Sequence, residues 1–456
     1  RPARPKAVLD VRARYEEALI AAALLRHQLV PEPQPEGKII ERVIVDSNDV
    51  ILPGDLPLAS YLPWTLANKV HVRTRPFIIS QELLFAVGQP YQADLFEESG
   101  RNLRSFFILS VARLVPVRGA TPGRIGILVV TKDQWSLRLN TNLAIDQSRL
   151  DSLSFSFSEN NLAGRNKTLS VNFAMDAGRL NIGMTYQDPR VWSTRLTMRL
   201  SAGLYLARSD SAVEGGAAHL VLGRPLYSLR TRFGWALSVD WDRGKSRSLS
   251  GGDLRVLTTA PFTFLRDLSL GGGPAAWALA GPPAVYRYQT LSGALEGTYS
   301  AGLRYKFNLT AGLRFASRRS DLSEEFPADA PQRVRDSFTN LYMPRSEDAS
   351  GPYLSVSSFE SRFVRLQNIE TFALSEDFRL GYAVTATLRY ATPLLGLSSH
   401  FAEAGTEISY RHYFGDDLLT YAVGLSGRLQ EGVYPQPPAT PLSGWQLVNQ
   451  DLSATL

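Results

Sequence analysis

Beyond residue 133 the sequence alternates apolar and polar residues with a period of two over most of its remaining length. Successive side chains of a β-strand point to opposite faces, so this period predicts strands with one apolar and one polar face. Many of the segments have the roughly nine to eleven residues that a tilted strand needs to cross a bilayer. The apolar positions of the first segments are Leu137, Leu139, Leu143 and Ile145; Leu153, Phe155 and Phe157; Leu169, Val171, Phe173 and Met175; Leu180, Ile182, Met184 and Tyr186; and Leu196, Met198, Leu200, Ala202, Leu204 and Leu206.

The apolar face of such strands has two interpretations. It forms the core of a soluble sandwich, or it faces lipid in a membrane barrel whose polar face lines a wet lumen. Roughly 320 residues of consecutive strands are too many for one sandwich, and the alternate positions are mostly small polar residues, glycine and arginine. We therefore predict a mainly β protein, a transmembrane antiparallel up-and-down β-barrel, with about twelve strands in this chain. Aromatic residues near strand ends suit an interfacial girdle: Trp135, Tyr186, Trp192, Trp235 and Trp241.

The composition excludes several classes of protein. The longest apolar run, residues 18–25, is too short for a membrane-spanning helix. The absence of cysteine excludes disulfides, thiolate metal sites and cysteine nucleophiles. The net charge is +6, but the arginines are scattered singly through strand-like segments, so we expect no nucleic-acid partner. Arginines in this pattern suit a polar lumen, turns or anionic lipid headgroups.

The first 133 residues differ from the rest. Residues 1–36 are expected to form a helix, over 9–30, and a linker containing Pro31, Pro33 and Pro35. Residues 37–133 predict a compact α+β domain with a strand at 38–45, helices at 77–87 and 92–105, and strands at 109–117 and 124–131, in the order β-α-α-β-β. The nearly all-apolar strand at 125–130 should be central, and the mixed strand at 109–117 should be an edge. Residues 134–456 would then be the barrel.

Several segments together resemble the outer-membrane assembly-factor superfamily of the BamA and TamA type, also described as bacterial surface antigens. Its members have periplasmic polypeptide-transport-associated (POTRA) domains before a transmembrane barrel. The first helix of the last such domain is resembled by residues 71–85 together with Gly88, Gln89, Pro90 and Tyr91. Its second helix is resembled by residues 97–104, and its passage into the first barrel strand by residues 131–137. Hairpins and strands of the family's barrel are resembled by residues 160–169, 186–190, 368–370 and 376–378.

The resemblance implies a barrel of sixteen strands, so we expect the C-terminal part of the barrel to be missing from this chain. The family's Arg-Gly-aromatic lumen loop is also absent. The only comparable string, Val117-Arg118-Gly119-Ala120, lacks the aromatic residue.

No constellation for covalent chemistry is found. The five histidines have no metal-ligand spacing, and no Gly-x-Ser-x-Gly motif occurs. We expect a protein that is not an enzyme and that needs no metal or cofactor.

The resemblance implies that the chain assists insertion, assembly or translocation of polypeptides, or of lipids, at the bacterial outer membrane, with residues 1–133 in the periplasm. The alternatives are a passive channel and a structural or adhesive surface barrel, and the long polar stretch 316–351 keeps the adhesive reading open. Expected partners are lipopolysaccharide and phospholipid, unfolded outer-membrane or secreted polypeptides, and envelope accessory proteins.

Two strands are candidate sites. An edge strand binds an extended client by strand addition, which predicts a partner-binding edge at Leu109, Val111, Ala112, Arg113 and Val115. The resemblance implies that the first barrel strand is a lateral seam, which would comprise Trp135, Leu137, Leu139, Leu143 and Ile145.

Overall fold

The computed structural model describes residues 6–52, 68, 71–146, 149–176, 178–250, 253–267, 277–367, 369–371, 374–393, 400–415, 417–431 and 444–455. The chain forms two compact units. The first comprises Arg1–Arg138, Ser158–Leu169 and Ser361–Leu380, and the second comprises Leu139–Phe157, Ser170–Glu360 and Gly381–Leu456. In the described part of the chain, none of the helices has the length and apolarity needed to cross a membrane.

The first unit is built on a three-stranded sheet with the strand order β1-β3-β2. Its strands are β1 (Ile39–Asn48), β2 (Leu109–Arg118) and β3 (Arg124–Asp133). Strand β3 runs parallel to β1 and antiparallel to β2. It lies in the centre and is buried over most of its length, as its nearly all-apolar sequence predicts.

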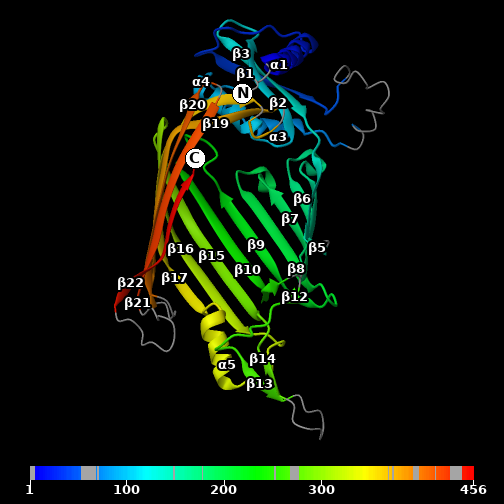
Figure 1. Cartoon of the computed structure of the whole chain (residues 1–456). Coiled ribbons are helices and arrows are strands. Elements are labelled where there is room, and N and C mark those ends of the chain that lie inside the picture. The colour runs from blue at the N-terminus through cyan, green and yellow to red at the C-terminus, as the bar shows by residue number, and fades with distance from the viewer. Residues whose placement is uncertain are drawn as a thin grey trace. The chain divides into compact units, whose positions relative to one another are not determined.

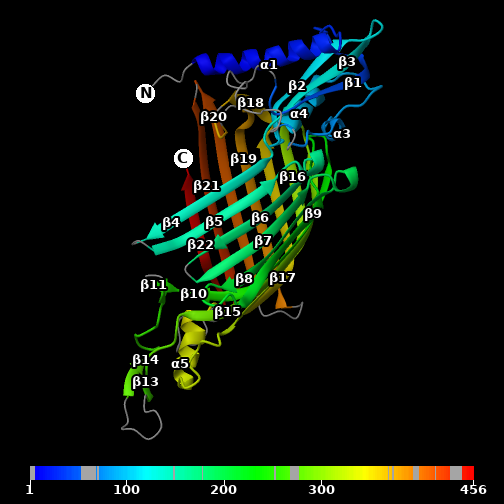
Figure 2. The same ribbon diagram turned by 90° about the vertical axis from the view of Figure 1, so that its right-hand side faces the viewer.

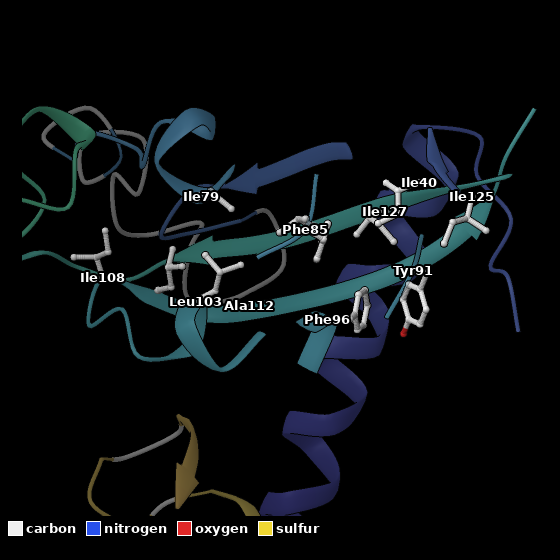
Figure 3. Packing of buried hydrophobic residues seen from close by; sticks show 12 residues of the cluster. Ile40, Ile79, Phe85, Tyr91, Phe96, Leu103, Ile108, Ala112, Ile125 and Ile127 are labelled. Carbon is white, nitrogen blue, oxygen red and sulfur yellow. The ribbon is translucent and has the colours of Figure 1, made fainter. Parts of the chain in front are cut away.

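Helices cover both faces of this sheet. On one face, α3 (Pro76–Ser80) and α4 (Ala93–Arg104) enclose a cluster that includes Ile79, Leu103 and Ile127 (Figure 3). On the other face, α1 (Lys6–Arg26) packs against Leu128 and Val130. This three-layer arrangement buries both sides of β3, because each helix presents an apolar stripe to one side of the sheet.

Helix α3 is shorter than the predicted helix over 77–87. It ends at Ser80, and the backbone N–H of Leu84 donates to Ser99 Oγ at 2.9 Å instead of continuing the helix. The N–H of Ala86 donates to the side chain of Gln89 at 3.0 Å. Side-chain acceptors thus replace the backbone hydrogen bonds that would have extended the helix.

The second unit is dominated by one large sheet, which confirms the predicted antiparallel meander and a mainly β fold. The sheet has 15 strands, including a few residues of the first unit, and every pairing from β7 to β22 is antiparallel. Figures 1 and 2 show these strands as a single curved layer. In sheet order they are β4 (Leu137–Asp146), β5 (Arg149–Glu159), β6 (Thr168–Met175), β7 (Arg179–Asp188), β8 (Thr197–Ala207), β9 (Val213–Arg224), β10 (Phe233–Arg247), β15 (Val285–Ala301), β16 (Tyr305–Leu322), β17 (Glu347–Glu360), β19 (Ser375–Ala391), β20 (Phe401–Phe414), β21 (Asp417–Glu431) and β22 (Trp445–Thr455), while β18 (Arg362–Gln367) pairs with β19 off this path.

The expected count of about twelve strands was too low, because two strands lack a clear alternation and two others were counted as one. Strand β9 begins with a run of glycine and alanine, and β22 is mostly polar. Strands β17 and β18 were read as one, although Ser361 separates them.

The two faces of the sheet differ as the alternation predicts. Large apolar side chains on one face are exposed on every second position, for example Leu139, Leu143 and Ile145 of β4 and Leu313 of β16. On the opposite face, polar side chains bond across strands, as in Thr298 and Thr310 (2.9 Å between hydroxyl oxygens). An exposed apolar face and a hydrogen-bonded polar face are what a lipid-facing sheet needs.

Two long connections at the ends of these strands fold together. The strands β11 (Leu249–Ser250), β12 (Asp253–Leu254), β13 (Phe264–Asp267) and β14 (Trp277–Ala280) follow β10, and α5 (Gln332–Ser337) with the π-helix Phe338–Tyr342 follows β16. A shared apolar cluster joins the connections, with Phe264 from the first and Phe338 from the second. The bounds of the expected polar stretch over 316–351 are wrong, because residues 316–322 belong to β16 and 347–351 to β17. Two short 3₁₀ turns, Leu162–Gly164 and Val191–Ser193, lie between earlier strands.

Candidate partner-binding edge

The candidate site begins with the outer edge of β2 in the first unit. One side of β2 pairs with β3. On the other side, the N–H of Arg118 donates to the carbonyl of Val30 (2.8 Å) and the N–H of Glu32 donates to the carbonyl of Pro116 (2.9 Å). Within the described residues, no strand pairs with residues 109–115 on this side. The edge is thus closed over its last few residues and open before them.

The two-residue period identifies which backbone groups belong to the open edge. The N–H of Arg118 and the carbonyl of Pro116 point away from β3. Backbone groups of an antiparallel strand alternate in direction, so those of Leu114 and Ala112 point the same way. A bulge between Leu109 and Val111 interrupts the alternation before them. A client strand that added here would bond to the backbone of Ala112 and Leu114.

The side chains of β2 are more committed to packing than the sequence suggested. Leu109, Ala112 and Leu114 join the cluster under α3 and α4. Val115 packs on the other side, towards α1. Helix α1 covers this second face of the sheet, so side chains on both faces of β2 are packed. The free surface of β2 is its backbone edge, since its side chains are largely occupied.

A cavity of about 160 Å³ lies beside this edge, inside the first unit. The hairpin formed by β18 and the start of β19 makes its opposite wall. The lining residues are Glu16, Arg104, Ser105, Phe106 and Phe107; Leu109, Ser110, Ala112 and Arg113 of β2; and Arg365, Thr371, Leu374, Ser375 and Glu376 of the hairpin. A space of this size holds a few water molecules, so an extended peptide enters only if the hairpin moves away.

Ion pairs hold the hairpin in this place. Arg104 donates from Nε and Nη2 to the two carboxylate oxygens of Asp377, at 2.6 and 3.0 Å. Arg113 Nη1 lies 2.9 Å from a carboxylate oxygen of Glu16, whose other oxygen accepts from Ser375 Oγ at 3.2 Å. Burial lowers the pKa of Arg365, whose Nε lies 3.9 Å from Asp377 Oδ1. A fork of two charge-assisted hydrogen bonds is among the stronger polar contacts in proteins.

Sequence reasoning did not find Glu16, Arg104 and Asp377 as parts of this site. The neighbour of Asp377, Glu376, accepts hydrogen bonds from the backbone N–H groups of Ile369, Glu370 and Thr371, at 3.0–3.1 Å, and so shapes the turn of the hairpin. A pair as distant in sequence as Arg104 and Asp377 leaves no local signal.

The candidate seam strand is β4, which stands at one end of the strand order of the large sheet, with β22 at the other. Leu139, Leu143 and Ile145 are exposed, and Leu137 is half-buried. The indole of Trp135 stacks on the ring of His71 at 6.5 Å between centroids. The structure brings the starts of the two candidate strands together, because the N–H of Gln134 donates to the carbonyl of Ile108 at 2.9 Å.

His71 is anchored by a buried contact. Its Nε2 lies 2.9 Å from Asp133 Oδ2, which also accepts from the N–H of Thr74 at 2.6 Å. The described residues contain no group of His, Asp or Glu side chains with metal-ligating geometry.

In comparisons with known proteins, the chain is similar to solved structures only. No family model matches the chain, and neither does any curated protein. Among solved structures, the chain is similar to BamA from Haemophilus ducreyi lacking POTRA domains 1–3, with a TM-score of 0.32 and 10% identity over 91% of this chain and 85% of that one. It is also similar to CdiB from Acinetobacter baumannii (TM-score 0.38, 10% identity, 90% of this chain and 57% of that one) and CdiB from Escherichia coli (TM-score 0.33, 10% identity, 93% and 78%).

Proposed function

We propose that this chain is an outer-membrane β-barrel protein that assists insertion, assembly or translocation of polypeptides at the bacterial outer membrane. Residues 1–133 act in the periplasm as a POTRA-like part that recognises the client. The observation that carries the proposal is the open backbone edge of β2 at Ala112 and Leu114. Ala112 also lines a cavity whose opposite wall is a hairpin. A passive channel has no use for such an edge.

The membrane part of the proposal rests on the exposed apolar face of the large sheet. Residues such as Leu204, Leu313 and Leu425 would each expose a large apolar side chain to water in a soluble protein. Burying such side chains in lipid is favourable by about 25 cal/mol per Å² of apolar surface. Outer-membrane lipids are therefore the partner of this face.

The client would bind by strand addition. An extended segment gains main-chain hydrogen bonds to β2, and its sequence matters little because backbone groups make the contact. The hairpin must first leave the edge, which breaks the pair of Arg104 with Asp377. Strand β4, at the end of the large sheet, is the seam where client strands enter the membrane.

A structural or adhesive surface barrel is the second candidate. The observation in its favour is the apolar cluster that joins the two long connections, including Phe264 and Phe338, because a folded outer layer is suited to contact with another surface. If adhesion is the function, changes in β2 leave it intact.

The substitution Ala112→Pro tests the client edge. Proline lacks the backbone N–H to which the added strand would bond, and no side chain can replace that donor. We expect loss of assembly or export activity in cells, whereas Ala112→Ser, which keeps the N–H, stays active and Arg113→Ala has a mild effect. Circular dichroism of the variants verifies that the unit is still folded.

Site-specific crosslinking provides the second readout. A photoreactive residue at Ser110, which lines the cavity, should capture unfolded barrel peptides in the parent chain and fail to do so with Ala112→Pro. Full activity of the folded proline variant, or crosslinks that contain no client polypeptide, would rule out the docking role.

A further inference from the structure

A row of polar and charged side chains crosses the polar face of the large sheet in the second unit. In the strand register, Tyr353 of β17 is opposite Arg389 of β19, Arg389 is opposite Glu403 of β20, and Glu403 is opposite Arg428 of β21. Directly opposed residues lie about 4.5–5.5 Å apart between Cβ atoms, so these side chains are neighbours. Leu388 and Tyr390, on either side of Arg389 in sequence, are exposed on the apolar face.

One edge of the Arg389 guanidinium lacks a partner. Its Nε and Nη2 are buried and have no hydrogen-bond acceptor among the described residues. The third nitrogen, Nη1, lies 3.9 Å from a carboxylate oxygen of Glu403, which is beyond hydrogen-bond distance. Leaving a buried cationic donor without an acceptor costs free energy, so we expect an acceptor to bind at this edge.

Other arginines of the chain show what a filled edge looks like. In Arg104, the same two atoms, Nε and Nη2, donate to both oxygens of Asp377. Arg247 of the large sheet is as buried as Arg389, with 14% of each side chain exposed, and a different pair of its nitrogens, Nη1 and Nη2, donates to the two oxygens of Glu214. Nε and Nη2 of a guanidinium form a fork that matches a carboxylate or a phosphate.

The aromatic neighbour of Arg389 contacts the flat face of its guanidinium and leaves this edge unfilled. The ring of Phe401 is almost fully buried, and the guanidinium carbons of Arg389 and Arg428 lie 5.1 and 3.6 Å from its centroid. Such contacts use the flat face of a guanidinium and leave its N–H edge free. Nε of Arg428 is likewise buried without an acceptor in the described part of the chain.

Arg389 lines a cavity of about 400 Å³. Exposed Arg314 also lines it. Two of its carboxylates already have partners, since Glu296 accepts from the hydroxyl of Tyr353 and Asp240 contacts His219. The segments 394–399 and 432–443, which follow β19 and β21 in the chain, contain no aspartate or glutamate. The chain therefore has no acidic side chain in those segments that could serve as the missing partner.

We propose that Arg389, assisted by Arg314, binds the carboxylate or phosphate group of a small solute in this cavity. Two oxygens of the anion would accept from Nε and Nη2 of Arg389, as the oxygens of Asp377 accept from Arg104. The volume lies in the range of small-molecule sites, roughly 300–1,000 Å³, and exceeds what a bare oxyanion fills, so the solute carries further polar atoms. This inference stands independently of polypeptide handling by β2.

Isothermal titration calorimetry on the full chain, folded into an uncharged detergent in chloride buffer, tests the site with inorganic phosphate and with succinate. We expect saturable binding of at least one of the two anions by the parent chain. Arg389→Lys keeps the charge but removes the fork, so its affinity should fall by about tenfold or more. Arg247→Lys is the matched control, because Nη1 and Nη2 of Arg247 are already paired with Glu214, and the anion affinity of this variant should match that of the parent.

Each alternative result overturns the site. It is wrong if the parent chain binds neither anion at millimolar concentration, or if Arg389→Lys binds as tightly as the parent. It is also wrong if Arg247→Lys loses affinity to the same extent, since the effect would then reflect net charge. The lysine variant is used because a neutral residue at 389 could impair folding, and heat-dependent migration on gels verifies that each variant is folded.

Discussion

At the scale of single residues, adjacent positions of one strand face opposite environments. Phe155 of β5 is exposed and stacks on Phe173 of β6, with 5.0 Å between ring centroids. The next residue, Ser156, donates to Asn172 Oδ1 at 2.7 Å on the other face. One position along the backbone therefore separates an apolar cross-strand pair from a polar one, as a strict period of two requires.

The substitution of arginine at these two neighbours gives a sharp contrast. A charge on the lipid face near the bilayer midplane costs about 2–4 kcal/mol, whereas the polar face accommodates it. We expect Phe155→Arg to lower the folding yield into detergent or lipid vesicles far more than Ser156→Arg. Heat-dependent migration on gels measures the folded fraction. Equal yields for the two variants would mean that Phe155 does not face lipid.

At the scale of elements, helix α1 could be predicted from the sequence, but the surface on which it packs could not. The spacing of apolar residues predicted the helix, but not that Leu19, Ile20 and Ala23 would pack on the far face of the β1–β3 sheet. Arg26 and His27, at the end of the helix, also contact buried Asp46, with the Arg26 Nη1 to Oδ1 distance at 2.7 Å. Periodicity identifies an apolar stripe but does not say which surface it covers.

The packing of α1 bears on where the N-terminal domain begins. The sequence placed that boundary at residue 37, and a fragment of residues 37–136 would leave Leu128 and Val130 uncovered. We expect a fragment of residues 6–136 to be monomeric with a sharp thermal transition, and the shorter fragment to bind a hydrophobic dye and unfold at lower temperature. Each large apolar side chain that is fully buried contributes about 1.5–3 kcal/mol.

Substitutions within the longer fragment control for length. Ala23 is 1% exposed and Leu25 is 80% exposed on the same helix. Ala23→Asp should destabilise the fragment as strongly as removal of the helix, and Leu25→Asp should not. Equal melting temperatures for both fragments would favour the boundary at residue 37.

The candidate edge was only partly predictable for a related reason. A mixed strand next to a fully apolar one indicated that β2 is an edge, and the strand order β1-β3-β2 agrees. The hairpin opposite the edge comes from residues 362–380, and no local pattern links it to β2. Contacts such as Arg104 with Asp377 depend on the tertiary fold, which is why residues of the cavity wall were missed. The vacant fork of Arg389 is likewise visible only when its neighbours across three strands are known.

At the scale of the whole molecule, the apolar face recurs in strands from one end of the large sheet to the other. Leu139 of β4, Leu204 of β8, Leu313 of β16 and Leu425 of β21 are all exposed. The polar face is represented on two of these strands by Thr310 and by Ser426, which lines the cavity beside Arg389. Two continuous faces of this kind suit a sheet that has acyl chains on one side and water on the other.

Because the chain has no cysteine, the environment of each face can be measured one position at a time with single introduced cysteines. Single cysteines at Leu139, Leu204, Leu313 and Leu425, labelled with an environment-sensitive dye, should be quenched by brominated lipids after folding into vesicles. Cysteines at Thr310 and Ser426 should instead respond to an aqueous quencher, because they lie on the polar face. If lipid quenching were confined to one or two strands, most of the sheet would lie outside the membrane. If it were strong at Ser426, the two faces would be exchanged, and the cavity at Arg389 would face lipid, where a charged solute could not reach it.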